Sequence, residues 1–298
     1  MTNPIVVKPS ADPWVIQAGG FYHYCYSDGR VHIRKAASLV AIGKGPATIV
    51  WTPPPDTMYS KDIWAPELHY IFGRWYIYVA CDNGDNAQHR MYALEGGADP
   101  LDPLSAPYTF KGKVSDAADK WAIDGTVLSI NSVNYFVWSG WEGDVDVGQN
   151  LYIARMNDPC SLSERVLLAA PEYEWEKQTL ALLEGPEALI HGSKVFIVYS
   201  ASASWTRYYC LGLLELTGDP LNPAHWTKHP EPVFKASERT GVFGVGHCSF
   251  VKVSTSVSDT DWIVYHGMTD GEGWHNRCVR AKLFTWDAAG MPVFGEPL

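Results

Sequence analysis

The chain has 298 residues and a formal net charge of −10, with 23 Lys and Arg against 33 Asp and Glu. The basic residues form no cluster, so nucleic acid is excluded as an expected partner, and anionic polymers would be repelled. A neutral ligand fits this charge better.

The N-terminal stretch MTNPIVVKPSADPW has no apolar core of signal-peptide length, and no segment approaches a membrane span. We therefore expect a soluble protein with no membrane partner. It is either cytoplasmic or secreted in a form from which the signal peptide has been removed. The six cysteines form no C-x-x-C pair and are expected to be reduced, structural thiols.

One unit recurs five times along the chain, as a turn motif, an apolar stretch, an aromatic strand and a further strand. The motifs are, in order, Asp12-Pro13-Trp14, Ala65-Pro66-Glu67, Asp124-Gly125-Thr126, Glu184-Gly185-Pro186 and Gly246-His247-Cys248. The aromatic strands begin near Phe21, Trp75, Tyr135, Val195 and Trp262. A period of about 60 residues built from short strands is typical of a β-propeller. The sequence thus predicts an all-β, five-bladed β-propeller that forms a single domain over residues 1–298.

The five motifs are expected to meet in space, because the first strand of every propeller blade lines the central axis. Asp12, Glu67, Asp124 and Glu184 are interpreted as occupying equivalent positions in four first strands, with His247 in the fifth. A carboxylate that caps a turn is the simpler interpretation for each one alone. Their recurrence in register favours an active site, since glycoside hydrolysis needs two carboxyl groups in different protonation states. A third charge nearby helps to keep the acid protonated.

The stretches ADPWVIQAGG, IWAPELHY, AIDGTVLS, LLEGPEAL and GHCSF resemble, in this order, the motifs of glycoside hydrolase family 43. The resemblance covers essentially the whole chain. It implies a five-bladed propeller with inverting glycosidase activity, in a family that includes α-L-arabinofuranosidases, β-xylosidases and endo-arabinanases.

The resemblance also implies roles for individual residues. Asp12 resembles the family's general base, Asp124 its pKa-modulating aspartate and Glu184 its general acid. Arg277 lies where the family often has an arginine near the acid and the modulator. His247 matches an axial histidine that in many members contacts an ion through water. We therefore expect no cofactor for the chemistry, but a possible structural calcium or other ion near His247.

Five further residues are candidates for substrate binding. Glu67 carries no agreed catalytic role from the family and is interpreted as structural or substrate-binding. His69 follows it by two residues and so shares its face on a strand. Trp14, Trp64 and Trp138 lie close to the catalytic motifs. They could form the apolar walls around a terminal sugar, and the alternative is that they serve packing within the protein.

The leading hypothesis is an inverting exo-hydrolase that releases terminal α-L-arabinofuranose from arabinan or arabinoxylan oligosaccharides, as in hemicellulose degradation. The motif sequences WAPELH, AIDGT and LLEGPEA favour this branch. The loops at 81–89 and 140–149 are expected to close the mouth of the propeller channel into a pocket. Alternatives are a β-xylosidase acting on xylose-containing oligosaccharides or an endo-arabinanase of the same family. A non-catalytic sugar-binding propeller is more remote, and the repeat is too long for a WD40 or Kelch propeller.

Overall fold

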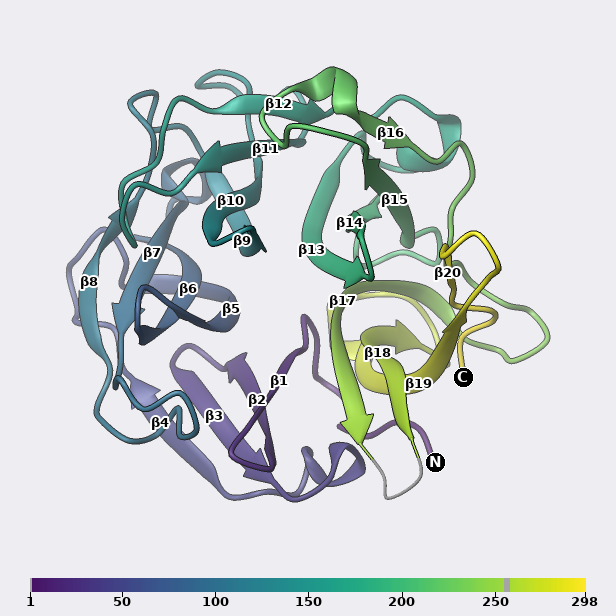
Figure 1. Ribbon diagram of the computed structural model, residues 1–298, viewed down its shortest axis with the longest axis horizontal. Helices are drawn as coiled ribbons and strands as arrows, with labels where there is room; N and C mark the ends of the chain where they lie inside the picture. Colours follow the sequence, from purple (N-terminus) through teal and green to yellow (C-terminus); the bar gives the residue numbers. More distant parts are fainter. Residues whose placement is uncertain (1, 255–257) are drawn as a thin grey trace.

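Five antiparallel four-stranded sheets form a ring around a central axis (Figure 1). The computed structural model describes residues 2–254 and 258–298. In every sheet the strands pair in chain order, from a first strand near the axis to a fourth strand at the rim. This confirms the predicted all-β, five-bladed propeller.

Each blade consists of four consecutive strands. Blade 1 contains β1 (Trp14–Ala18), β2 (Phe21–Ser27), β3 (Val31–Ala36) and β4 (Ala47–Trp51). Blade 2 contains β5 (Lys61–Ile71), β6 (Arg74–Asp82), β7 (Arg90–Glu95) and β8 (Thr109–Val114). Blade 3 contains β9 (Ala122–Ile130), β10 (Val133–Gly140), β11 (Asn150–Arg155) and β12 (Val166–Ala169). Blade 4 contains β13 (Leu183–His191), β14 (Lys194–Ala201), β15 (Cys210–Leu216) and β16 (Trp226–Lys228). Blade 5 contains β17 (Phe243–Ser254), β18 (Asp259–Met268), β19 (Cys278–Trp286) and β20 (Pro292–Val293).

The connections include five short 3-10 helices in the described residues: η1 (Leu39–Ala41), η2 (Asn86–Gln88), η3 (Glu174–Glu176), η4 (Pro223–His225) and η5 (Trp274–Asn276). No helix within the described ranges is long and apolar enough to cross a membrane.

The core is divided into five apolar clusters, each between two neighbouring blades. Aromatic side chains of the second strands are fully buried in them, as for Trp75, Phe136, Tyr199 and Tyr265. Because blades pack face to face, both faces of these strands are covered, which explains their nearly continuous apolar and aromatic sequences. Most of the aromatic residues thus serve packing between blades. All six cysteines lie in described segments and are free thiols, as expected.

The ring is closed by the N-terminal segment, which pairs with the last blade. Val6 forms an antiparallel bridge with Val279 of β19, and the Ile5 backbone N–H donates to the Val279 carbonyl at 2.9 Å. The Asn3 side chain donates to the carbonyls of Ala281 and Leu298. Hydrophobic residues of blades 1 and 5 form the fifth apolar cluster beneath this seam, so the seam is packed like the other four interfaces.

A β-bulge interrupts the first strand at the same place in four blades. In blade 2, Trp64 pairs with Ala80 and Glu67 with Tyr78, so three steps on β5 oppose two on β6. The same shift occurs in β9, β13 and β17. Such a bulge adds one residue, bends the strand and re-aims its side chains.

The bulge defines which positions are equivalent around the axis. Its first residue has a positive φ in every case, at Ala65, Asp124, Gly185 and His247, and Asp12 has the same conformation just before β1. Of the predicted set, Asp12, Asp124 and His247 therefore share one position. Glu184 precedes the shared position by one residue and Glu67 follows it by two, which corrects the expectation that four carboxylates are equivalent. The expectation was wrong because a sequence motif does not show at which residue a bulge begins.

Candidate active site

A pocket of about 480 Å³ opens beside Asp12 at the mouth of the ring. It is lined by residues from four segments, at 9–12, 27–29, 62–66 and 274–277. Asp12 and Arg277 belong to this lining, as does Trp64 of β5. The loops at 81–89 and 140–149, which were expected to close the mouth into a pocket, contribute none of the lining residues. The walls of this pocket come from other connections.

Contacts of His247 connect the predicted catalytic carboxylates. Its Nδ1 lies 3.3 Å from Oδ1 of Asp12 and 3.8 Å from Oδ2 of Asp124. Asp124 Oδ2 also accepts a hydrogen bond of 3.0 Å from the backbone N–H of Gly185, the residue after Glu184. The structure thus brings Asp12, Asp124, Glu184 and His247 together from four blades.

Asp12 lies among nitrogen groups. Arg277 Nη1 is 3.4 Å from its Oδ1, and Nδ1 of the fully buried His266 is 3.3 Å from both its Oδ1 and its backbone N. Burial alone would raise the pKa of Asp12, but the charges of His247 and Arg277 and the contact with His266 outweigh it and hold the pKa well below its usual range. Burial lowers the pKa of His266 to about 4, so this ring is neutral near pH 7, and its Nδ1 serves one of the two contacts at a time.

Glu184 lies in the opposite electrostatic environment. Burial, followed by the charge of Asp124, raises its pKa to about 8, against the hydrogen bond that its Oε1 accepts from Tyr209 Oη at 2.8 Å. Burial and the charge of Asp12 likewise raise the pKa of Asp124 well above its usual value. Near neutral pH the site therefore has an ionised Asp12 and a protonated Glu184.

Because their pKa values differ in this way, Asp12 and Glu184 can carry out opposite proton transfers. An ionised carboxylate accepts a proton from water, and a protonated carboxyl group donates one to a leaving oxygen. Environments that push two pKa values apart assign the acid and base roles in this way. The arrangement is what acid–base hydrolysis of a glycoside requires.

Trp64 is the predicted aromatic residue that lies at the pocket. Its side chain is 38% exposed and stacks on the ring of His89 with centroids 4.1 Å apart. His89 is fully buried, and its Nδ1 lies 2.8 Å from a carboxylate oxygen of Asp82. The indole is thus fixed on one face and available to a ligand on the other.

Glu67 and His69 lie outside the pocket lining and form a hydrogen-bonded pair. His69 Nε2 is 2.9 Å from Oε2 of Glu67, and both side chains are buried. Trp14 packs over His69 at 4.5 Å, and its Nε1 donates to the Leu68 carbonyl. Glu187, on β13, has a pKa raised by burial and then by Glu67. None of these residues belongs to the pocket lining.

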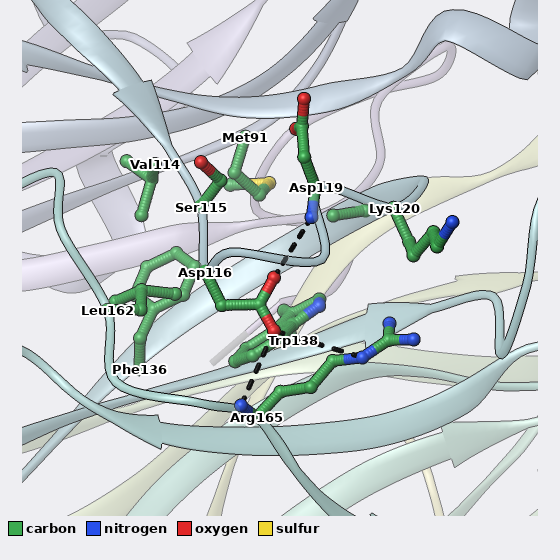
Figure 2. A pocket seen from close by; sticks show the side chains of 11 residues that line it. Met91, Val114, Ser115, Asp116, Asp119, Lys120, Phe136, Trp138, Leu162 and Arg165 are labelled. Carbon is green, nitrogen blue, oxygen red and sulfur yellow. Dashed lines mark hydrogen bonds and ion pairs between the residues drawn. The ribbon is translucent and has the colours of Figure 1, made fainter.

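Trp138 lines a separate, narrow crevice between blades 2 and 3. Figure 2 shows this crevice, in which Asp116 accepts hydrogen bonds from the backbone N–H groups of Asp119 and Arg165 and faces the Arg165 guanidinium. Its free volume is about 10 Å³, comparable with a single water. Trp138 is only 5% exposed and packs on Phe136.

Several residues of the site were not found from the sequence. His266 lies on the second strand of blade 5, and Tyr209 and Ser200 come from blade 4 away from any first-strand motif. Trp274, which is 57% exposed and packs edge-on against Trp205, lines the pocket next to Arg277. No local signal marks these residues, because they reach the site from the second and third strands and their connections.

Comparison with known proteins agrees with this geometry. Residues 1–292 match the family described as "Glycosyl hydrolases family 43". The chain is 36% identical over its whole length to "Extracellular exo-alpha-(1->5)-L-arabinofuranosidase" of Streptomyces avermitilis, of which the match covers 63%. It is 33% identical over 99% of its length to "Alpha-L-arabinofuranosidase 43" of Humicola insolens, again covering 63% of that protein. The chain thus spans somewhat less than two thirds of these relatives.

A solved structure extends the similarity to the fold. The crystal structure of an alpha-L-arabinofuranosidase from Lactobacillus brevis has a TM-score of 0.89 and 34% sequence identity, and the match covers 99% of this chain and 96% of that one. The propeller, the converging carboxyl groups and these matches lead to one conclusion: the chain belongs to glycosyl hydrolases family 43.

Proposed function

We propose that this protein is an inverting exo-glycoside hydrolase that releases terminal α-L-arabinofuranose from arabinan and arabinoxylan oligosaccharides. The observation that carries the proposal is the convergence of Asp12, Asp124, Glu184 and His247 in one contact network, whose surroundings lower the pKa of Asp12 and raise that of Glu184. The names of the relatives, all arabinofuranosidases, support the sugar.

In this mechanism Glu184 gives its proton to the glycosidic oxygen as the bond from that oxygen to the anomeric carbon breaks. Asp12 takes a proton from a water that attacks the same carbon from the opposite face, so the configuration inverts. The products are free arabinose and an oligosaccharide with a new hydroxyl group. Asp124 assists through its charge, which raises the pKa of Glu184.

Trp64 and Arg277 are proposed to contact the terminal sugar, because both line the pocket beside Asp12. Trp14, Glu67 and His69 lie outside this lining, Trp14 partly buried and the other two buried, and would act on the substrate through the residues that they pack against. Trp138 would act from farther away, through the packing between blades 2 and 3.

An ion near His247 fits the side chains poorly as a directly bound calcium. In the described part of the chain no three His, Cys, Asp or Glu side chains are arranged to hold a metal. Nδ1 of His247 faces two carboxylates. An ion there would need water for most of its ligands, and no step of the mechanism depends on it.

We further propose that residues 1–298 act as one catalytic domain. An extracellular location is proposed from the name of the Streptomyces relative. The expected partners are arabinose-containing oligosaccharides; xylose-containing ones are the alternative that the assay must test.

The test is a set of three assays on purified protein. Release of nitrophenol should be faster, by kcat/KM, from the 4-nitrophenyl α-L-arabinofuranoside than from the β-D-xylopyranoside, and the reverse order would make the protein a β-xylosidase. Arabino-oligosaccharides should yield free arabinose. If linear arabinan lost viscosity quickly with little free arabinose, the enzyme would act internally on the chain. Binding of oligosaccharide without any turnover would identify a sugar-binding propeller.

A further inference from the structure

Glu184 lies at the end of a series of polar contacts that starts on the backbone of blade 5. The backbone N–H of His247 donates to Ser200 Oγ at 2.8 Å. The Ser200 hydroxyl lies close enough to the Tyr209 phenol to lower the pKa of that phenol. Tyr209 Oη lies 2.8 Å from Oε1 of Glu184.

Counting protons sets the direction of this series. A hydroxyl group has one proton to donate, and a buried one is normally hydrogen-bonded. Ser200 is fully buried and its oxygen already accepts from His247, which leaves its own proton free to point to the neighbouring Tyr209. The proton of Tyr209 is then left for Glu184. Burial and the charge of Glu184 raise the pKa of Tyr209 well above its usual value, so the phenol keeps that proton.

The phenol is held in place on both sides. The ring of Tyr209 is fully buried and stacks on the ring of His266, with centroids 5.3 Å apart and planes 2° from parallel. A Cβ at Gly246 would overlap the Tyr209 ring, so glycine is what admits the ring at this point. Since His266 also contacts Asp12, the residue that holds the acid packs directly on a residue that contacts the base.

We propose that Tyr209, supported by Ser200, is a positioning residue that reserves Oε1 of Glu184 as a hydrogen-bond acceptor, so that the acid carries its transferable proton on Oε2. Oε2 is then the atom that protonates the glycosidic oxygen. This inference rests on the proposed role of Glu184 as the general acid. It concerns which oxygen carries the proton, which the family assignment leaves open.

The proposal predicts in which direction the pKa of Glu184 should move when the Tyr209 hydroxyl is removed. The groups that face it are Asp124, Asp12, His247 and Tyr209. Of these, Tyr209 donates a hydrogen bond that stabilises the carboxylate form. Removing the phenol should raise the pKa of Glu184 further and let the proton occupy either oxygen. If the series ran the other way, with Glu184 donating to Tyr209, the same removal would lower that pKa.

The central variant is Tyr209→Phe, measured by the pH dependence of kcat/KM. We expect the alkaline limb to move upward by about one pH unit. We also expect kcat on arabino-oligosaccharides to fall by about tenfold, as part of the effect of acid catalysis. The aryl arabinofuranoside should change little, because a nitrophenolate leaves without protonation. A downward or unchanged limb would contradict the proposal.

A matched control is Tyr199→Phe. Tyr199 is also buried and donates to a buried carboxylate, Glu176, at 2.7 Å, but it belongs to the apolar cluster between blades 3 and 4. This variant loses a similar hydrogen bond, but to Glu176 and not to Glu184, and should leave the pH profile and the ratio of the two substrates unchanged. A shift equal to that of Tyr209→Phe would show that the effect is general destabilisation.

An infrared measurement needs neither turnover nor a folded Tyr209→Phe protein. The difference spectrum between the wild type and Glu184→Gln at acidic pH isolates the carbonyl stretch of protonated Glu184. We expect the lowered frequency of a carbonyl that accepts a hydrogen bond, since Oε1 would be that carbonyl. A frequency typical of a free carbonyl would overturn the inference, whereas absence of hydrolysis in the wild type would overturn the proposed function instead.

Discussion

The two sides of the candidate site show how neighbouring groups decide whether the effect of burial on the pKa of a carboxyl group persists or is reversed. Burial is the largest influence on both Asp12 and Glu184, and it raises both pKa values. Asp12 faces Arg277, His247 and His266, which reverse the effect. Glu184 faces Asp124 and a neutral phenol, so the effect persists. Residues of blades 5 and 1 therefore surround the proposed base, and residues of blades 3 and 4 surround the proposed acid.

The strongest test of this comparison replaces each carboxyl group by its amide. Asp12→Asn should lower kcat by about 10²–10⁴-fold on every substrate, because water activation is lost in each case. Glu184→Gln should lower kcat by a similar factor on arabino-oligosaccharides but much less on the aryl arabinofuranoside. Initial rates on the two substrates separate the roles.

A suitable control for these two variants is Asp270→Asn, at an exposed carboxylate paired with Lys8. It should leave both rates unchanged. If Glu184→Gln slowed both substrates equally and Asp12→Asn slowed only the oligosaccharide, the assignment of acid and base would be reversed.

The wild-type pH profile tests the acid side directly. Glu184 must be protonated to work, and its pKa is raised to about 8. Activity should therefore hold through neutral pH and decline above about pH 8, by about tenfold per pH unit. A decline that began near pH 5 would mean that Glu184 titrates like an exposed carboxyl group.

Replacing Arg277 tests the base side with a smaller effect. Arg277→Gln removes one of the positive charges that lower the pKa of Asp12. The acidic limb of kcat/KM should move upward by about one pH unit or more, with the alkaline limb unchanged. Arg207, which pairs with Glu238 at the surface, supplies the control variant Arg207→Gln. Movement of the alkaline limb alone would show that Arg277 acts on the acid.

The smallest effect is expected from removal of metal ions. Exhaustive chelation should leave kcat unchanged, because the charges that separate the two pKa values come from protein side chains. If a hydrated ion is bound at His247, chelation should lower the melting temperature, and added calcium should restore it. Loss of kcat on chelation, with recovery on adding calcium, would show that an ion takes part in setting the site.

Much of the fold and the proposed reacting groups follow from the sequence alone. The five repeated units predict the blades because each unit is a local pattern of strands and turns, which short windows of sequence reveal. The motifs at Asp12, Asp124 and Glu184 were identifiable for the same reason. The closing seam between Val6 and Val279 was not predicted, since it joins opposite ends of the chain.

The tertiary structure decided how these groups are aimed and how they titrate. A one-residue bulge moves a side chain to the other face of a strand, so only the pairing register shows that Gly185, and not Glu184, is equivalent to Asp12 and Asp124. The pKa values depend on Arg277 and Tyr209, which arrive through space from other strands. Electrostatic and hydrogen-bonding effects act over distances of a few ångströms regardless of separation along the chain, so local patterns of sequence could name the acid and the base but not the residues that tune them.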